Sequence, residues 1–267
     1  MKKILFPTDC SAGAQHAFEF AVELAQRTGS AIEVMSVYHL PAADASSVPP
    51  AYIEQMIEDR RRQVQENIAR FLSGFPGAPL GKVHADYGIF THQEIVDIAE
   101  REGHDLIVMG THGADNTADR LLGSVTTHTI MQSPCPVLSI PSNAVWKGVR
   151  HIAYASDFHP ADEHAVSQLA QLATALGAQL HFVHIQTGDT DPDKEVQLGK
   201  YPNAFSDFSI VRHSSVIEGL DSYLREHSID MLSLFIPRRR IWERLFHSSF
   251  SRKMVFHTEL PLLTFRE

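Results

Sequence analysis

The chain has few cysteines, no long apolar run and no excess of positive charge. Its 267 residues include two cysteines, Cys10 and Cys135, which is too few for a disulfide framework and indicates a reducing compartment. No stretch approaches the roughly 20 apolar residues of a membrane-spanning helix. The opening apolar run stops at Pro7 and Asp9, well short of a signal-peptide core. We therefore expect a cytoplasmic protein with no membrane partner.

The charge balance is acidic. Its 32 Asp and Glu residues outnumber 23 Lys and Arg, for a formal net charge of -9, which argues against a protein that mainly coats nucleic acid. We expect no DNA partner, although a local basic patch stays open. The 43% hydrophobic and 21% charged residues are typical of a folded globular protein. The length suits one large domain or two domains of about 130 residues.

An internal repeat favours two domains. Residues 4–10 correspond to 152–158, and in both segments a short apolar run ends at an aspartate and leads into a helical pattern. Residues 105–109 likewise match 230–234. The offset falls from 148 to 125 residues between the two matches, so the second copy is 23 residues shorter.

Within each copy, short apolar runs alternate with amphipathic segments, which is typical of βαβ units on a parallel sheet. In the first copy we expect strands at 3–8, 31–38, 81–86, 105–110 and 136–140. Helices are expected at 12–27, 52–71, 92–102 and 124–131. In the second copy we expect strands at 150–155, 180–185, 208–212, 230–235 and 261–265, with most of the long second helix missing. The predicted fold is α/β, with two tandem doubly wound parallel-sheet domains of five strands each.

Turn-forming residues at 141–148 follow one strand and precede the next, which predicts a linker. We place the first domain at 1–143 and the second at 149–267. Gly29 and Gly103 stand just beyond two predicted helices, where glycine commonly ends a helix.

Three spaced glycines form the sharpest motif. Gly110 closes an apolar strand, Gly113 follows, and Gly123-Ser124-Val125 opens a helix. The carboxyl edge of a parallel sheet is where open α/β folds bind ligands. Glycine lets the backbone approach phosphate oxygens, and amides at a helix N-terminus favour anions. Glycines that merely turn the chain would give a similar pattern, so spacing alone leaves both interpretations open.

This pattern of G-x-x-G, nine residues and G-S resembles the universal stress protein family from Lys3 to Pro141, with a weaker echo to Phe265. The resemblance implies a Rossmann-like fold of the adenine nucleotide α-hydrolase type, and ATP binding in stress response or regulation. It also implies that the two domains pair through their last strands, at 136–140 and 261–265, as an internal pseudo-dimer. A homodimer and an unknown protein partner are further expectations.

The resemblance also implies which residues form the nucleotide site. Asp9 resembles the acid that contacts ribose or adenine, with Pro7 and Thr8 shaping that wall. Val37 resembles the second-strand residue whose backbone meets adenine. The other ribose and phosphate contacts are implied for Met109, Gly110, Gly113, Gly123, Ser124 and Val125. Without the family, Asp9 fits equally well as an acid at a helix N-terminus.

The loop between the glycines contains side chains that could also reach phosphates. Arg120 is a better cation for this role than His112, because a histidine is largely neutral at pH 7. Asp115 and Asp119 indicate either an intervening Mg²⁺ or a loop turned away from the phosphates. We assign no metal ligand.

The motif lacks the Gly-Lys-Ser/Thr of a Walker A loop, and we identify no water-activating base or arginine finger. We therefore assign no catalytic residue and expect at most slow ATP hydrolysis. A slow ATPase or nucleotidyl transferase of the same fold, and a scaffold without ligand, are the alternatives.

The second copy has lost all three glycines. Phe235 stands where the first copy has Gly110, and Pro237 removes an amide donor, so the same phosphate cradle cannot form. Asp157 alone remains of the signature. We expect one nucleotide site per chain and a structural second domain. The arginines at 238–240 fit either an acidic partner or a solvated turn.

Overall fold

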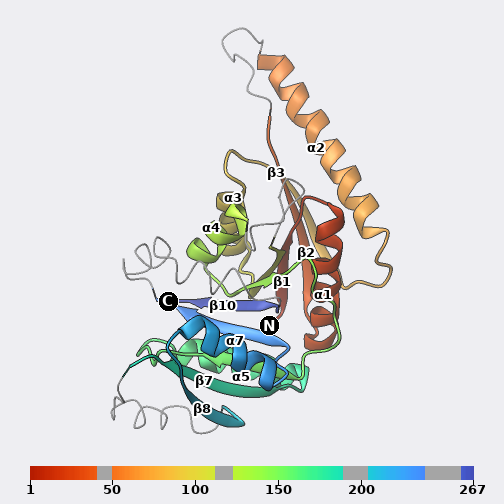
Figure 1. The fold of residues 1–267 in the computed structure, drawn as a ribbon. Coiled ribbons are helices and arrows are strands. Elements are labelled where there is room, and N and C mark those ends of the chain that lie inside the picture. The colour runs from red at the N-terminus through yellow and green to blue at the C-terminus, as the bar shows by residue number, and fades with distance from the viewer. Residues whose placement is uncertain (41–49, 112–122, 189–203, 238–259) are drawn as a thin grey trace.

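The computed structural model describes residues 1–40, 50–111, 123–188, 204–237 and 260–267 (Figure 1). The strands are β1 (Lys3–Pro7), β2 (Ala31–Tyr38), β3 (Leu80–Tyr87), β4 (Leu106–Gly110), β5 (Val137–Ile140), β6 (His151–Ala155), β7 (Gln179–Gln186), β8 (Asp207–Arg212), β9 (Met231–Ile236) and β10 (Leu262–Arg266). The helices are α1 (Ala12–Thr28), α2 (Pro50–Leu72), α3 (Thr91–Glu102), α4 (Ser124–Gln132), α5 (Glu163–Leu176) and α7 (Val216–Glu226). Each strand and helix expected from the periodicity is present, with ends that differ by at most two residues.

The described strands form one ten-stranded sheet in the order β3-β2-β1-β4-β5-β10-β9-β6-β7-β8. All neighbours are parallel except β5 and β10, which pair antiparallel at the centre. Each half is therefore a doubly wound arrangement of five strands, and the predicted fold class is confirmed. The central pair is the contact between last strands that the family resemblance implied.

Side chains add two buried hydrogen bonds across this central seam. The Ser139 hydroxyl donates to the Leu262 carbonyl at 3.2 Å. The Thr264 hydroxyl donates to the Val137 carbonyl at 3.1 Å. Both hydroxyl groups are buried and hydrogen-bonded, so each stabilises the antiparallel register. A buried hydroxyl without a partner would instead lower the stability of the fold.

Helices cover both faces of the sheet, and left-handed glycines end several of them. Residues of α1, α2 and α5 pack in one apolar cluster, and residues of α3, α4 and α7 pack in the cluster on the other face. Gly29 (φ 66°) and Gly103 (φ 67°) end α1 and α3 in the left-handed conformation, as expected. Gly177 does the same after α5. Glycine has no Cβ to clash there.

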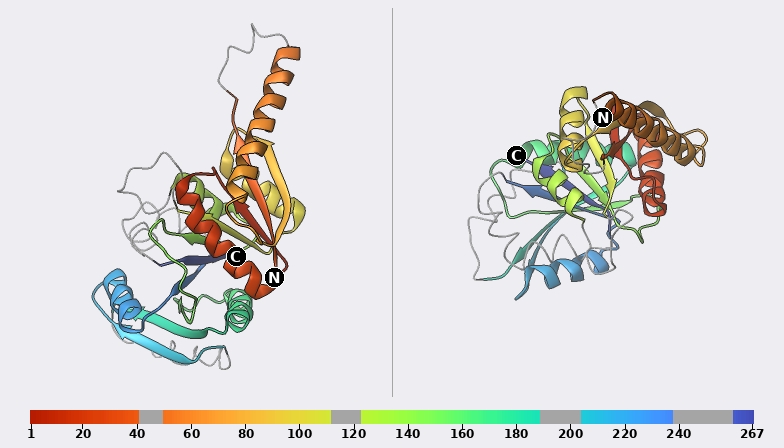
Figure 2. Two further views of the ribbon diagram at one scale, coloured as in Figure 1. Left: turned by 90° about the vertical axis from the view of Figure 1, so that its right-hand side faces the viewer. Right: turned by 90° about the horizontal axis from the view of Figure 1, so that it is seen from above.

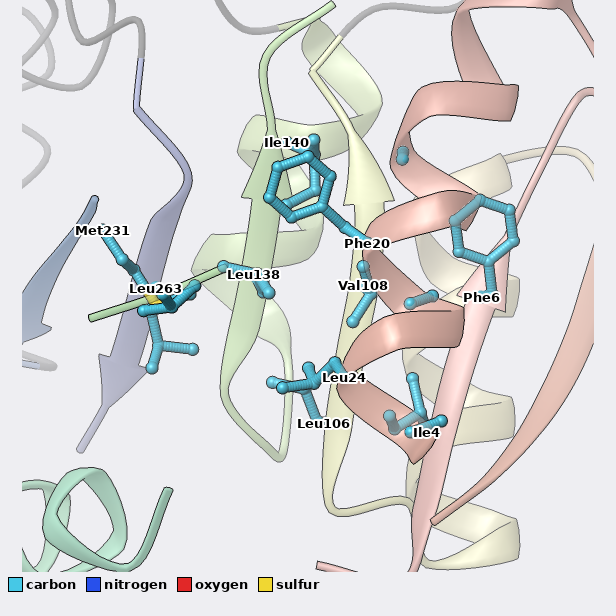
Figure 3. Close-up of a cluster of buried hydrophobic side chains, with 14 of the residues drawn as sticks. Ile4, Phe6, Phe20, Leu24, Leu106, Val108, Leu138, Ile140, Met231 and Leu263 are labelled. Atoms are coloured by element: carbon cyan, nitrogen blue, oxygen red, sulfur yellow. The ribbon is translucent and has the colours of Figure 1, made fainter. Parts of the chain in front are cut away.

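The two halves share one core. Figure 3 shows Leu138 and Ile140 of β5 in the same cluster as Met231 of β9 and Leu263 of β10. All four side chains are nearly inaccessible to solvent. Residues 141–150 form no helix or strand, which suits a linker. The division into domains at 1–143 and 149–267 remains our proposal.

Candidate functional site

The carboxyl ends of β1 and β4 lie next to each other in the first half. Strand β1 pairs with β2 on one side and with β4 on the other, so the strand order reverses between β1 and β4. Ligands of open α/β sheets bind outside the strands at such a reversal. Asp9 follows β1 and Gly110 ends β4, and the fold therefore brings these two candidate residues to one place. We call this place the β1/β4 crevice.

A tight turn forms the wall of the crevice after Pro7, the last residue of β1. The Thr8 amide donates to the Met35 carbonyl at 2.8 Å, and the Cys10 amide donates to the Thr8 hydroxyl at 2.9 Å. Cys10 is left-handed, with φ of 59°. The Ser11 amide donates to Asp9 Oδ1 at 3.0 Å. The exposed Asp9 carboxylate thus supports the turn that leads into α1, while the N-cap of that helix is Ser11, whose side chain accepts from the Ala14 amide.

The opposite wall consists of the end of β4 and the start of α4. The Thr111 amide donates to the Ile140 carbonyl at 2.9 Å, and the Gly123 amide donates to the Thr111 carbonyl at 2.6 Å. The Thr126 hydroxyl donates to the Gly110 carbonyl at 3.1 Å. These bonds hold the N-terminus of α4 against the end of β4. The intervening residues, with Gly113, His112 and Arg120, lie outside the described part of the chain.

The first turn of α4 offers backbone amides to an anion. Its N-cap residue is Gly123, which makes no side-chain capping bond. The first amides of any helix lack partners within the helix and carry a partial positive charge. Ser124 is exposed at the first helical position. This arrangement suits phosphate oxygens.

Three of the candidate residues turn their side chains into the core. Met109 is buried, and Val37 and Val125 pack against the apolar cluster beneath α3 and α4. A contact from Met109 to a ligand would therefore come mainly from its backbone, whereas Val37 and Val125 keep part of their side chains exposed.

The second half keeps the same turn after its first strand. The Ser156 amide donates to the Val183 carbonyl at 3.1 Å, and the Phe158 amide donates to the Ser156 hydroxyl at 2.9 Å. Phe158 has φ of 64°, as Cys10 has 59°. The repeat is therefore preserved down to individual hydrogen bonds and the left-handed residue.

Aromatic side chains occupy the equivalent place in the second half. The Phe158 ring is 6% exposed and lies 5.3 Å from the Phe182 ring and 4.9 Å from the His184 ring. The His159 ring, after β6, lies 5.4 Å from the Phe235 ring at the end of β9. A ring contact thus bridges the ends of β6 and β9, which correspond to β1 and β4 of the first half.

Sequence reasoning missed a buried polar cluster in the second half. Asp162 is fully buried, and its carboxylate accepts hydrogen bonds from the Tyr154 hydroxyl at 2.9 Å and the Ser156 hydroxyl at 3.3 Å. The first copy has Phe6 at the position of Tyr154. That exchange was the available signal, because a tyrosine hydroxyl in a core position needs a partner.

It also missed a charged cluster at the opposite, amino edge of the sheet. Glu33 Oε1 lies 3.5 Å from Lys3 Nζ, while its Oε2 lies 3.0 Å from His84 Nε2 and 3.2 Å from His104 Nε2. Burial would raise the pKa of Glu33, but the His84 hydrogen bond and nearby positive charge lower it. Burial lowers the pKa of His104, whose ring is not aligned for a hydrogen bond.

The second half has a different cluster at the same two strand positions. His151 and His181 replace Lys3 and Glu33 in the repeat. His181 Nε2 lies 3.0 Å from His151 Nδ1, and His181 Nδ1 lies 3.0 Å from Asp207 Oδ1. Among the residues that the structure describes, no group of three or more ligating side chains could hold a metal ion.

The two thiols are in environments that keep them protonated. Burial raises the pKa of Cys10, and the Asp9 charge adds to this effect. Burial raises the pKa of Cys135 to about 11. A reactive thiolate at either position is therefore disfavoured at neutral pH. In the described parts of the chain, no helix is both long and apolar enough to cross a membrane.

Comparison with known proteins identifies the family. Residues 1–141 match the model of the universal stress protein family. Universal stress protein MJ0577 of Methanocaldococcus jannaschii is 33% identical over an alignment of 159 residues, and the match covers 52% of this chain and 94% of that protein. Universal stress protein A homolog 1 of Coxiella burnetii is 30% identical over an alignment of 143 residues, and the match covers 52% of this chain and 95% of that protein.

A solved structure matches the whole fold. The crystal structure of a universal stress protein from Archaeoglobus fulgidus has a TM-score of 0.70 and 18% sequence identity, and the match covers 99% of this chain and 96% of that chain. At this identity the likeness shows the fold of both halves and not a shared ligand. The sequence matches in the first half place the chain in a family: it belongs to the universal stress proteins.

Proposed function

We propose that this protein binds one adenine nucleotide, ATP, in the β1/β4 crevice, and that its second half is structural. The observation that supports this most is the set of hydrogen bonds that join the end of β4 to the start of α4. It holds helix amides without a side-chain cap beside the turn that bears Asp9. Amides fixed in this way can bind phosphate without reorganisation.

The proposed contacts follow the two walls of the crevice. Asp9 would accept a hydrogen bond from ribose or adenine, with Pro7 and Thr8 beside it, and the backbone of Val37 would meet the adenine. The phosphates would lie against Gly110, Gly113, Gly123 and the Ser124 amide and hydroxyl, next to Met109 and Val125. The nucleotide would bind with or without Mg²⁺.

We assign this site a binding or sensing role in stress response or regulation, in the cytoplasm, with at most slow hydrolysis. No catalytic residue is proposed. An unknown protein partner would respond to the difference between the ATP-bound and empty states.

Two measurements test the proposal. Native mass spectrometry of freshly purified protein should detect bound adenine nucleotide, and isothermal titration with ATP should give one site per chain. Two equivalent sites would contradict the proposed asymmetry. No bound nucleotide and no titration would favour a scaffold without ligand. Rapid Mg²⁺-dependent release of ADP would favour an enzyme.

A further inference from the structure

Helix α2 extends beyond the sheet on which it packs. Figures 1 and 2 show its N-terminal part projecting from the body of the molecule. Its C-terminal part is anchored in the core by Val64, Ile68 and Phe71, which are all buried. None of the residues from 51 to 63 is buried. The helix therefore has an anchored half and a projecting half.

The apolar stripe of the anchored half continues into the projecting half. Ile53 and Ile57 precede Val64 and Ile68 by eleven residues in each case, a separation of three helical turns. They therefore lie on the same face of the helix as the core residues, N-terminal to the buried segment. Both are only partly buried, and the neighbouring Tyr52 ring is 57% exposed. This stripe is available to a partner.

Charged residues beside the stripe have a self-complementary order. Glu54 and Arg61 are seven residues apart, so they lie on the same flank of the stripe, two turns from each other. Both are exposed, and neither forms an ion pair with another described residue. When two such helices run in opposite directions, the acid of each faces the base of the other.

We propose that two copies of the chain associate through an antiparallel pair of α2 helices. Ile57 lies near the two-fold axis, Ile53 packs on either side of it, and Glu54 faces Arg61 of the second copy twice. A two-fold contact requires one surface that complements itself, and this combination of stripe and charges meets that requirement. It favours a second copy over an unrelated protein as the occupant.

The contact is small, so the association is weak. Stable interfaces bury about 1,200–2,000 Å² in total, and three turns of two helices bury less than that. We expect dissociation in the micromolar range and weaker association at high salt, because exposed charges are screened.

A charge-exchange experiment on the full chain tests the pairing. Sedimentation velocity from about 1 to 200 µM should show wild-type protein passing from monomer to dimer. Glu54→Arg and Arg61→Glu should each raise the dissociation constant at least about tenfold, because each places like charges opposite each other twice. An equimolar mixture of the two variants should associate as wild type does, since every facing pair is then again of opposite sign.

Matched controls lie on the far side of the same helix. Asp59→Arg and Arg62→Glu make the same changes of charge away from the stripe and should leave association unchanged. Ile57→Asp should abolish it, and because Ile57 is only partly buried, the melting temperature of this variant should stay near that of wild type. A wild-type chain that is monomeric throughout, control variants that weaken association equally, or a mixture that stays monomeric would each overturn the proposal.

Discussion

The two halves of this protein have the same backbone turn after their first strand, but different side chains at the neighbouring strand ends. In both halves a backbone amide donates to a Thr or Ser hydroxyl two residues earlier, and the residue that carries this amide is left-handed. The turn of the first half borders a crevice flanked by Gly110, whereas rings of His159 and Phe235 meet across the second. A repeat can thus keep its fold while large side chains remove its site, because the backbone hydrogen bonds do not depend on those side chains.

The largest expected effect is on ATP affinity at the β1/β4 crevice. Gly123→Val should abolish measurable ATP binding, because it adds a branched side chain where phosphate would approach the start of α4. Its φ of -67° and ψ of 160° are accessible to valine, so the fold should survive. Gly113→Val is expected to have the same effect. Titration with ATP and thermal melting without it check this, and unchanged affinity in both variants would refute the assignment.

Substitutions at the corresponding place in the second half should change the free energy of unfolding instead of ligand binding. Phe158→Ala should cost about 3–5 kcal/mol of unfolding free energy, as is usual for a buried phenylalanine. Cys10→Ala at the same place in the first half removes a smaller, half-buried side chain and should cost about 1 kcal/mol. Chemical denaturation of both variants measures the difference. Phe158→Ala should not create a second ATP site. A stoichiometry of two ATP per chain would show that the Phe158 side chain alone prevents binding in the second half.

The aspartates that follow β1 and β6 should now have different roles. Asp9→Ala should weaken ATP binding by about 1.5–3 kcal/mol, as expected when one partner of a charge-assisted hydrogen bond is lost. Asp157→Ala should leave affinity unchanged and cost at most about 1 kcal/mol of stability. Both variants should be titrated with ATP and melted without it. If only Asp157→Ala lost affinity for ATP, the nucleotide site would be in the second half.

The smallest effect concerns the buried charges at the amino edge of the first half. The pKa of folded His104 is depressed, so the unfolded chain binds a proton there more readily below its ordinary pKa of about 6.5. Its contribution to stability is present above that pH and is lost as the pH falls. The pKa of Glu33 is also depressed, which adds a further loss below about pH 4.3, the ordinary glutamate value.

The melting temperature of wild-type protein should therefore fall between pH 7 and pH 5. In His104→Gln this decline should be smaller, because the residue no longer titrates. Identical slopes in the two proteins would contradict the assignment of this effect to the first half.

Much of this architecture follows from local patterns in the chain. Strand and helix positions were predictable to within two residues because apolar spacing reports which face of each element is buried. Gly29 and Gly103 marked helix ends because a left-handed residue is needed there. The loss of the spaced glycines in the second half was visible as well. Phe235 adds a side chain where the first half has Gly110, and Pro237 has no amide hydrogen to donate.

Contacts between distant segments required the tertiary structure. Asp162 bonds to Tyr154 across a turn, and Glu33 meets His84 and His104 from other elements. No periodicity along one strand records such partners, because they depend on strand order and on how each side chain turns.

The sequence determined that this protein has two α/β repeats, that each repeat has five strands, and that one repeat alone has the three spaced glycines. These properties depend on neighbours within a few residues, whose preferences act before the chain is compact. The tertiary structure decided that β5 and β10 join both repeats into one sheet, that β1 lies beside β4, and that Phe158 and His159 contact the rings of Phe182 and Phe235. Such outcomes depend on burying apolar surface between segments far apart in the chain, which only the complete fold can bring together.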